Sequence, residues 1–199
     1  MSERNKIGRR SFERYWEGVH PDFLRVPEQL EHPSRKRIAE EASKVGDSVL
    51  DVGCDSCVDY PRFKKAGIRY TGIDITEKFI KRAKELYPGI DARVGTAYDL
   101  PFSDGSYGSV YCKDLFEHLP PDGYKQAIKE MWRVTRKLMM IAFYLPTNNK
   151  PTKYHLIVSG HYEQSYNERE IVDFISGLKN FNGLEIIRSV GCLYVARKK

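Results

Sequence analysis

Several residues that can do chemistry stand together in the stretch GCDSC, which begins at Gly53. Cys54 and Cys57 form a CxxC pair, the spacing of dithiol oxidoreductases, in which a helix N-terminus lowers the thiol pKa. The stretch also follows the short β-rich run SVLDV, and a glycine directly after such a strand is typical of a cofactor-binding turn. The two interpretations imply different proteins, and residues elsewhere in the chain separate them.

The remaining cysteines do not complete a metal site. A structural zinc site needs four ligands, usually as two close pairs, and only the scattered Cys112 and Cys192 remain. We therefore expect no metal ion, and we expect Cys54 and Cys57 to pack as small residues within the turn. A redox role for this pair stays open as the weaker alternative.

An acidic residue farther along the chain favours the cofactor-binding turn. Asp74 ends a second β-rich run, RYTGID, and lies 21 residues after Gly53, which is the span of one strand–helix–strand unit. Strand–helix–strand units build parallel sheets, in which the ligand lies beyond the carboxyl ends of the strands. We therefore expect Gly53 and Asp74 to meet at one site. Because a carboxylate there can accept hydrogen bonds from both hydroxyls of a ribose, the pair predicts a ribose-bearing cofactor.

The charge of the turn indicates which cofactor this is. A dinucleotide turn needs G-x-G-x-x-G so that backbone amides can surround a pyrophosphate, but Asp55 stands at the second glycine position. Its carboxylate would face phosphate oxygens, at a cost of about 1–3 kcal/mol in a partly buried site. S-adenosylmethionine has no phosphate, and its ammonium and sulfonium suit Asp51 and Asp55. We therefore predict this cofactor, and an NAD-type oxidoreductase is the weaker alternative.

Length and composition set broad limits. The chain has 199 residues, of which 41% are hydrophobic and 30% charged, which suits one α/β domain with a buried core. Its longest apolar run, about eight residues at 138–145, is far shorter than the roughly 20 needed to span a bilayer. The first ten residues have no hydrophobic region of signal-peptide type, and the four cysteines are irregularly spaced. We therefore expect a cytoplasmic protein without a membrane partner.

The hydrophobic pattern predicts alternating strands and helices. We expect strands at residues 48–53, 69–74, 91–95, 109–114, 138–145, 184–190 and 192–199, and helices at 27–45, 58–67, 76–89, 122–137 and 167–180. A small hairpin turning at Ser159 and Gly160 interrupts this alternation. The pattern predicts an α/β fold with a Rossmann-like, doubly wound, seven-stranded and mostly parallel sheet whose last strand is antiparallel.

The chain is expected to form one domain with an extension. Residues 1–27 are basic and aromatic and predict an arm that can act as a lid. Residues 28–199 predict the cofactor-binding domain, with a small insertion on the substrate side at 146–166.

Taken together, these motifs resemble the class I S-adenosylmethionine-dependent methyltransferase family, in its type 11-like methyltransferase domain, over about residues 35–199. The stretch VLDVGCDSC is similar to the glycine-rich first motif, with Asp55 and Cys57 where the family usually has glycines. YTGID is similar to the second motif, and VGTAYDLPFSDGSYGSVYCKDLFEHLP to the segment through the fourth strand. The resemblance implies an enzyme that transfers a methyl group from S-adenosylmethionine.

The resemblance also assigns contacts with the cofactor. It implies that Asp74 binds the ribose, that Ile75 packs against the adenine, and that Thr96 and Ala97 line the adenine edge. Cys112 and Lys113 would line the methionine moiety. The predicted cofactor site comprises Asp51, Gly53, Cys54, Asp55, Asp74, Ile75, Thr96, Ala97, Tyr98, Cys112 and Lys113.

Further polar and aromatic residues are expected near the methyl acceptor. Asp114 and His118 are the candidate general bases, needed only if the acceptor must lose a proton. The candidate substrate or lid residues are Arg14, Tyr15, Trp16, Tyr144, His155 and His161. Ordinary packing or a solvated position is the alternative for each of them.

The sequence favours a small-molecule acceptor. The insertion at 146–166 is short, and no nucleic-acid-binding module is recognisable. The basic arm and the formal net charge of +6 keep RNA or protein acceptors open. A protein that binds the cofactor without transferring its methyl group is a further alternative.

Overall fold

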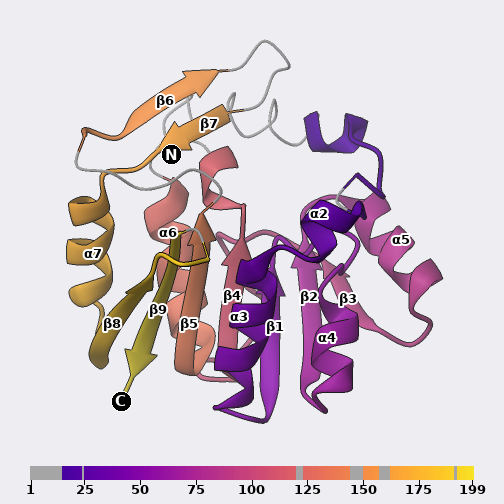
Figure 1. The fold of residues 1–199 in the computed structure, drawn as a ribbon, viewed down its shortest axis with the longest axis horizontal. Coiled ribbons are helices and arrows are strands. Elements are labelled where there is room, and N and C mark those ends of the chain that lie inside the picture. The colour runs from indigo at the N-terminus through magenta and orange to yellow at the C-terminus, as the bar shows by residue number, and fades with distance from the viewer. Residues whose placement is uncertain (1–14, 24, 120–122, 144–149, 157–161, 191) are drawn as a thin grey trace.

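The structure of the protein, a computed structural model, is built on a seven-stranded sheet in the order β3-β2-β1-β4-β5-β9-β8 (Figure 1). It describes residues 15–199 apart from 24, 120–122, 144–149, 157–161 and 191. The strands are β1 Ser48–Val52, β2 Arg69–Asp74, β3 Asp91–Val94, β4 Tyr107–Lys113, β5 Thr135–Phe143, β8 Phe181–Ile187 and β9 Cys192–Lys198. Neighbours from β3 to β5 are parallel, whereas β9 is antiparallel to both β5 and β8. The predicted fold class is thereby confirmed.

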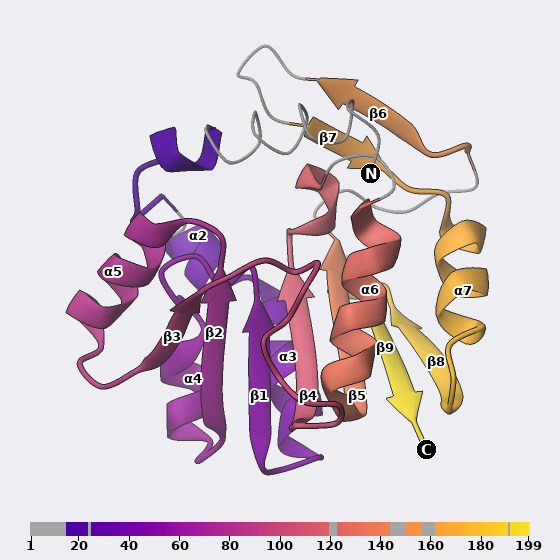
Figure 2. The ribbon, with the colours of Figure 1, turned by 180° about the vertical axis from the view of Figure 1, so that it is seen from behind.

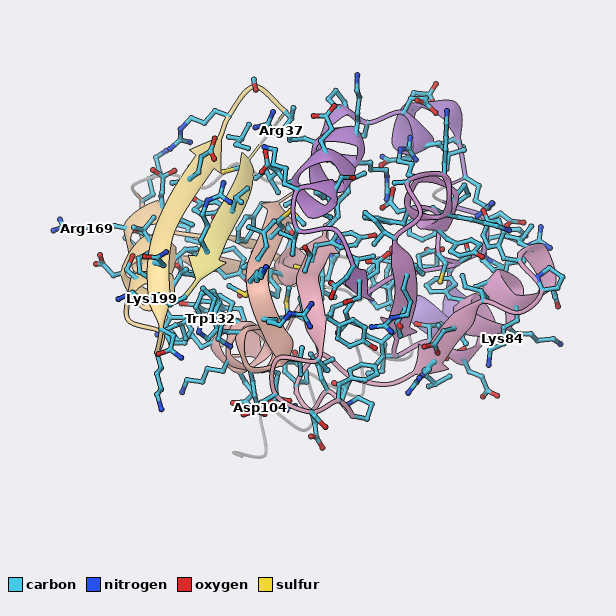
Figure 3. The ribbon with its side chains drawn as sticks, turned by 90° about the horizontal axis from the view of Figure 1, so that it is seen from below. Arg37, Lys84, Asp104, Trp132, Arg169 and Lys199 are labelled. Atoms are coloured by element: carbon cyan, nitrogen blue, oxygen red, sulfur yellow. The ribbon has the colours of Figure 1, made fainter. Side chains whose placement is uncertain are left out.

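Helices cover both faces of this sheet and bury a hydrophobic core on each. One face carries α3 Pro33–Ser43, α4 Tyr60–Lys65 and α5 Glu77–Leu86, and the other carries α6 Gly123–Val134 and α7 Glu168–Ser176. Figures 1 and 2 show these two layers from opposite sides. In Figure 3, seen from below, Arg37 lies on the α3 side and Trp132 on the α6 side. The short helix α2, Pro27–Leu30, precedes α3, so the helical segment expected at 27–45 is divided before Pro33.

The helix predicted at 122–137 ends earlier than expected. The chain leaves the helix after Val134, and Thr135 already pairs with Tyr107 of β4. The Thr135 hydroxyl donates to the carbonyl of Met131 at 2.6 Å and so closes the last helical turn. Two consecutive β-branched residues favour the extended backbone here, which the apolar period alone did not reveal.

A small two-stranded hairpin lies beyond the carboxyl ends of the parallel strands (Figure 2). It pairs β6 Lys153–Leu156 with β7 Tyr162–Ser165, and the predicted turn at Ser159 and Gly160 lies outside the described residues. Just after β7, the buried Tyr166 hydroxyl donates to the carbonyl of Phe116 at 2.6 Å. Phe116 begins the short 3₁₀ helix η1, Phe116–His118, so the hairpin is fastened to the turn that follows β4.

In the described part of the chain, no helix has the length and apolar character needed to cross a membrane.

A buried ion pair joins α3 to the turn before α4. The Arg35 guanidinium lies 2.5 Å from the carboxylate of Asp59, and both side chains are only 4% exposed. Arg35 also donates through Nε to the carbonyl of Gln29 at 2.7 Å, and the Tyr111 hydroxyl lies 3.4 Å from Asp59. Because an isolated buried charge is costly, each member of this pair requires the other.

We expect Arg35→Met to lower the free energy of unfolding by about 3–5 kcal/mol, because the buried Asp59 carboxylate would lose its close cation and keep only Arg62, at 3.6 Å. Guanidinium denaturation followed by circular dichroism measures this change. The matched control is Arg136→Met, which removes an ion pair to Asp47 whose side chains are 43% and 52% exposed. That variant should lose less than about 1 kcal/mol. Equal losses in the two variants would contradict the assignment.

Candidate functional site

A hollow of about 340 Å³ opens at the carboxyl ends of β1, β2 and β4. This is the edge of a doubly wound sheet where ligands bind. Segments far apart in the sequence meet around it, from the N-terminal segment, residues 15–23, to η1. Its wall is formed by Trp16, Phe23, Gln29, Gly53, Asp55, Ile73, Asp74, Ile75, Thr76, Phe79, Gly95, Thr96, Ala97, Tyr98, Lys113, Asp114, Leu115, His118 and Leu119.

The turn after β1 has the backbone of a glycine-rich loop. Gly53, Asp55 and Cys57 have φ angles of 74°, 51° and 55°, all in the left-handed region. A Cβ atom on Gly53 would lie 3.0 Å from Leu115 Cδ1, so this position needs glycine for space as well as for conformation. The two other positions are those where glycines were expected. Aspartate tolerates a left-handed backbone better than most residues, whereas cysteine has no such advantage.

Asp74 is held at the end of β2 by two backbone amides. Its Oδ2 accepts from the N–H of Asp55 and its Oδ1 from the N–H of Thr76, both at 2.9 Å. Thr76 is the residue before α5, and its side chain makes no capping hydrogen bond. Burial raises the pKa of Asp74, while the two amide hydrogen bonds oppose that rise. The carboxylate is therefore fixed in place on the wall of the hollow, with lone pairs left for a ligand.

Asp55 presents a second carboxylate to the same hollow. The residue is 5% exposed, its Oδ1 accepts from the N–H of Ser56, and its Oδ2 is buried with no hydrogen-bond partner. Burial raises the pKa of Asp55 to about 7. An orphaned buried oxygen on the wall of a hollow is suited to a ligand that brings a cation or a hydrogen-bond donor.

The end of β4 contributes an ion pair. Lys113 Nζ contacts the carboxylate of Asp114, and the two side chains are 5% and 19% exposed. Asp114 has a φ of 54°, and its N–H donates to the carbonyl of Ala142 at 2.9 Å. The left-handed backbone at Asp114 and the β-sheet pairing of Lys113 bring both side chains to the rim of the hollow.

The N-terminal segment closes one side of the hollow. Trp16 lies against His118, with ring centroids 5.1 Å apart, and Phe23 stacks on Phe79 of α5 at 6.0 Å. The segment is fastened to α5 by Arg82, which donates to both carboxylate oxygens of Asp22 at 2.9 and 3.0 Å. The segment, indigo in Figure 1, lies beside α5 at the top of the sheet.

The CxxC pair is buried within the turn. The two Sγ atoms lie 3.5 Å apart, and a Cβ on Gly72 would come within 2.8 Å of both. Burial raises the pKa of Cys54 well above its usual value, the opposite of the shift in a reactive dithiol. Among the described residues, no group of three or more His, Cys, Asp or Glu side chains is arranged to hold a metal ion.

Eleven residues predicted from the sequence form part of the wall: Trp16, Gly53, Asp55, Asp74, Ile75, Thr96, Ala97, Tyr98, Lys113, Asp114 and His118. Three predicted cofactor residues lie behind it. Asp51 is buried beneath the turn and accepts from the Tyr70 hydroxyl at 2.6 Å, while Cys54 and Cys112 lie in the hydrophobic cores. The side chains of these three residues therefore do not reach a ligand in the hollow.

The remaining predicted substrate residues lie elsewhere. Tyr15 packs edge-on against Trp16 with ring centroids 5.1 Å apart, outside the wall itself. His155 belongs to β6, and Arg14, Tyr144 and His161 lie outside the described residues.

Sequence reasoning missed the apolar part of the wall. Phe23, Phe79, Leu115 and Leu119 have no polar group to mark them, and Gln29 comes from a helix with no motif. The one usable signal was position, since Leu115 directly follows Asp114 and Leu119 directly follows His118, the two candidate bases.

The wall residues fit S-adenosylmethionine. Asp74 offers fixed carboxylate oxygens for a ribose, and the neighbouring wall at Ile75 and Ala97 is apolar, as an adenine requires. The orphaned oxygen of Asp55 suits an ammonium group. A pyrophosphate would meet this carboxylate instead of a row of free amides, so a dinucleotide fits less well.

Comparison with known proteins agrees with this chemistry. A family model described as a methyltransferase domain matches residues 49–137. The O-methyltransferase resE of Aspergillus sclerotiorum is 28% identical over 129 residues, 61% of this chain and 48% of that protein. The demethylmenaquinone methyltransferase of Renibacterium salmoninarum is 31% identical over 105 residues, 51% of this chain and 44% of that protein. The chain thus spans about half the length of the curated relatives it matches.

Solved structures share the fold. The 1,6-didemethyltoxoflavin-N1-methyltransferase of Burkholderia thailandensis, solved with S-adenosylhomocysteine, superposes with a TM-score of 0.72 at 15% identity. The match covers 98% of this chain and 90% of that one. The methyltransferase-domain match over residues 49–137, the sheet order and the wall of the hollow together support a class I S-adenosylmethionine-dependent methyltransferase, with S-adenosylmethionine as its cofactor.

Proposed function

We propose that the protein transfers the methyl group of S-adenosylmethionine to a small-molecule acceptor. The observation that carries this proposal is the pair of carboxylates on one wall, Asp74 fixed by two backbone amides and Asp55 with an unpaired buried oxygen. The first suits a ribose diol and the second suits the α-ammonium of the same cofactor. Both charges also favour a ligand with a net positive charge over a dinucleotide.

The chemistry of the site follows from this placement. The bound cofactor supplies an activated methyl group, so the chain's own residues need mainly to position the reactants and exclude water. Trp16, Phe23 and Leu115 form the apolar wall that does so. Asp114 and His118 lie at the rim and serve as candidate bases if the acceptor must lose a proton.

The proposed acceptor class is supported by the relatives. Two of their names, demethylmenaquinone methyltransferase and norajmaline N-methyltransferase, give small molecules as acceptors. The hairpin β6–β7 is the main addition at this edge of the sheet, and it is small. Transfer of labelled methyl groups to a panel of small phenols and amines, with RNA and protein as parallel acceptors, tests this part. Labelling of RNA or protein alone would overturn the small-molecule assignment.

We expect Asp74→Ala to weaken the binding of S-adenosylhomocysteine by at least about 100-fold, since two charge-assisted hydrogen bonds to the ribose are lost. Isothermal titration calorimetry measures the affinity. Wild-type protein is expected to bind this ligand in the micromolar range and NAD far more weakly.

The control for this loss is Asp91→Asn, a change of another strand-borne carboxylate that is 43% exposed and away from the hollow. It should leave the affinity unchanged. Undiminished binding by Asp74→Ala would contradict the ribose assignment, and NAD binding in place of S-adenosylhomocysteine would contradict the function. Cofactor binding without transfer to any acceptor would indicate a non-catalytic binding protein.

The cofactor affinity should rise with pH through about 7. Burial raises the pKa of Asp55 to about 7, so the carboxyl is neutral below that pH and charged above it. An ammonium group binds the charged form better, so binding lowers this pKa and releases a proton. Calorimetry between about pH 6 and pH 8, repeated in buffers of different ionisation enthalpy, measures both effects.

Asp55→Asn isolates this group. We expect the variant to bind about tenfold more weakly than wild type at pH 8 and to lose most of the slope with pH. Asp51, whose pKa burial and the charge of Asp59 also raise to about 7, remains in the variant behind the wall. A slope that persists unchanged in Asp55→Asn would move the assignment from Asp55 to Asp51.

A further inference from the structure

The charges on the wall of the hollow are unevenly distributed. Its carboxylates are Asp55, Asp74 and Asp114, and Lys113 is the single lysine or arginine among the wall residues that the structure describes. S-adenosylmethionine has one anionic group, the α-carboxylate of its methionine part. In a partly buried site this anion needs a cation, because facing the carboxylates alone would disfavour it.

Lys113 already has an anionic partner. Its side chain is 5% exposed and contacts the carboxylate of Asp114, the next residue. The positive charge of Lys113 also reaches His32 at the start of α3, where burial first and Lys113 second lower the imidazole pKa. The ammonium is therefore within electrostatic range of His32 as well as in contact with Asp114, and its flexible stem allows it to reorient.

Asp114 is less free to move than Lys113. Its backbone is left-handed and tied to Ala142 by a 2.9 Å hydrogen bond, and its short side chain is 19% exposed at the rim. When the ammonium of Lys113 turns away, the Asp114 carboxylate stays at the rim and loses its counter-charge. A partly exposed carboxylate in this state readily accepts a hydrogen bond from a ligand.

We propose that Lys113 is the anchor for the cofactor carboxylate, and that it releases Asp114 to receive the acceptor when the cofactor is bound. This inference rests on the proposed function and adds two things to it. It makes Lys113 a specificity residue for ligands with an α-carboxylate. It also predicts ordered binding, because Asp114 is available to a hydroxyl or amine of the acceptor only after Lys113 has left it.

The test compares two ligands that differ only in the carboxylate, S-adenosylhomocysteine and its decarboxylated analogue, 5′-(3-aminopropylthio)-5′-deoxyadenosine. Calorimetry with wild-type protein should show the first binding at least about tenfold more tightly. Lys113→Met should abolish this preference by weakening the first ligand alone, and Lys113→Arg should retain most of it. Thermal melting by circular dichroism verifies that each variant is folded.

The variant Asp114→Asn tests the exchange of partners. Without a competing carboxylate, Lys113 is free for the cofactor, so S-adenosylhomocysteine should bind several-fold more tightly while the analogue is unchanged. A purely structural role of Asp114 would weaken both ligands or change neither.

The outcomes separate this inference from the proposed function. Wild-type protein that binds neither ligand overturns the proposed function. Wild-type protein that binds both ligands equally, or a Lys113→Met variant that weakens both alike, overturns the anchor alone. A preference that depends on Lys113 but is not strengthened in Asp114→Asn overturns the exchange.

Discussion

The site depends on the fixed carboxylate of Asp74. This side chain accepts the amide of Asp55 in the turn after β1 and the amide of Thr76 at the start of α5, so it joins two strand ends and one helix. Both hydrogen bonds bring partial positive charge toward a buried carboxylate and offset the cost of its burial. Because the turn is tied to β2 in this way, it keeps a glycine-like path at Asp55 and Cys57. The hollow takes its shape from that path and from the close approach of Leu115 to Gly53.

The carboxylates under and around the turn set a second constraint. Asp51 and Asp59 lie close enough for the charge of Asp59 to raise the pKa of Asp51, and two guanidinium groups balance Asp59, that of Arg35 at 2.5 Å and that of Arg62 at 3.6 Å. The Tyr70 hydroxyl donates to Asp51 and the Tyr111 hydroxyl lies near Asp59, so hydroxyl groups also help to stabilise these buried carboxylates. Asp51 lies behind the wall, and above about pH 7 its charge adds to those of Asp55 and Asp74 in favouring a cationic ligand. Long-range charge and direct contact thus act in the same direction.

The sequence predicted the fold class and the polar half of the site, and the reasons are visible in particular residues. β1 and β2 were recognisable as short β-rich runs that are buried on both faces, and α5 was recognisable because its buried residues recur at helical spacing. Asp55 and Asp74 were identifiable because few residue types satisfy their chemistry. The end of α6 was misplaced because Val134 and Thr135 continue the helical period while preferring extended backbone. The aromatic wall of Trp16, Phe23 and Phe79 depends on how the N-terminal segment folds back on α5, a long-range contact that no local pattern encodes.

The two non-glycine residues of the turn also bear on the thermodynamics of binding. A glycine-rich loop is conformationally loose before its ligand arrives, and ordering it consumes part of the binding free energy. Side chains at Asp55 and Cys57 restrict the unfolded and unliganded chain more than glycine does, although holding each in the left-handed region costs roughly 1–2 kcal/mol. The cost of the left-handed backbone at these two residues is therefore met when the chain folds, and not when the ligand binds. Side chains at these two positions leave the loop fewer conformations to lose, so association carries a smaller entropic penalty than with glycines there.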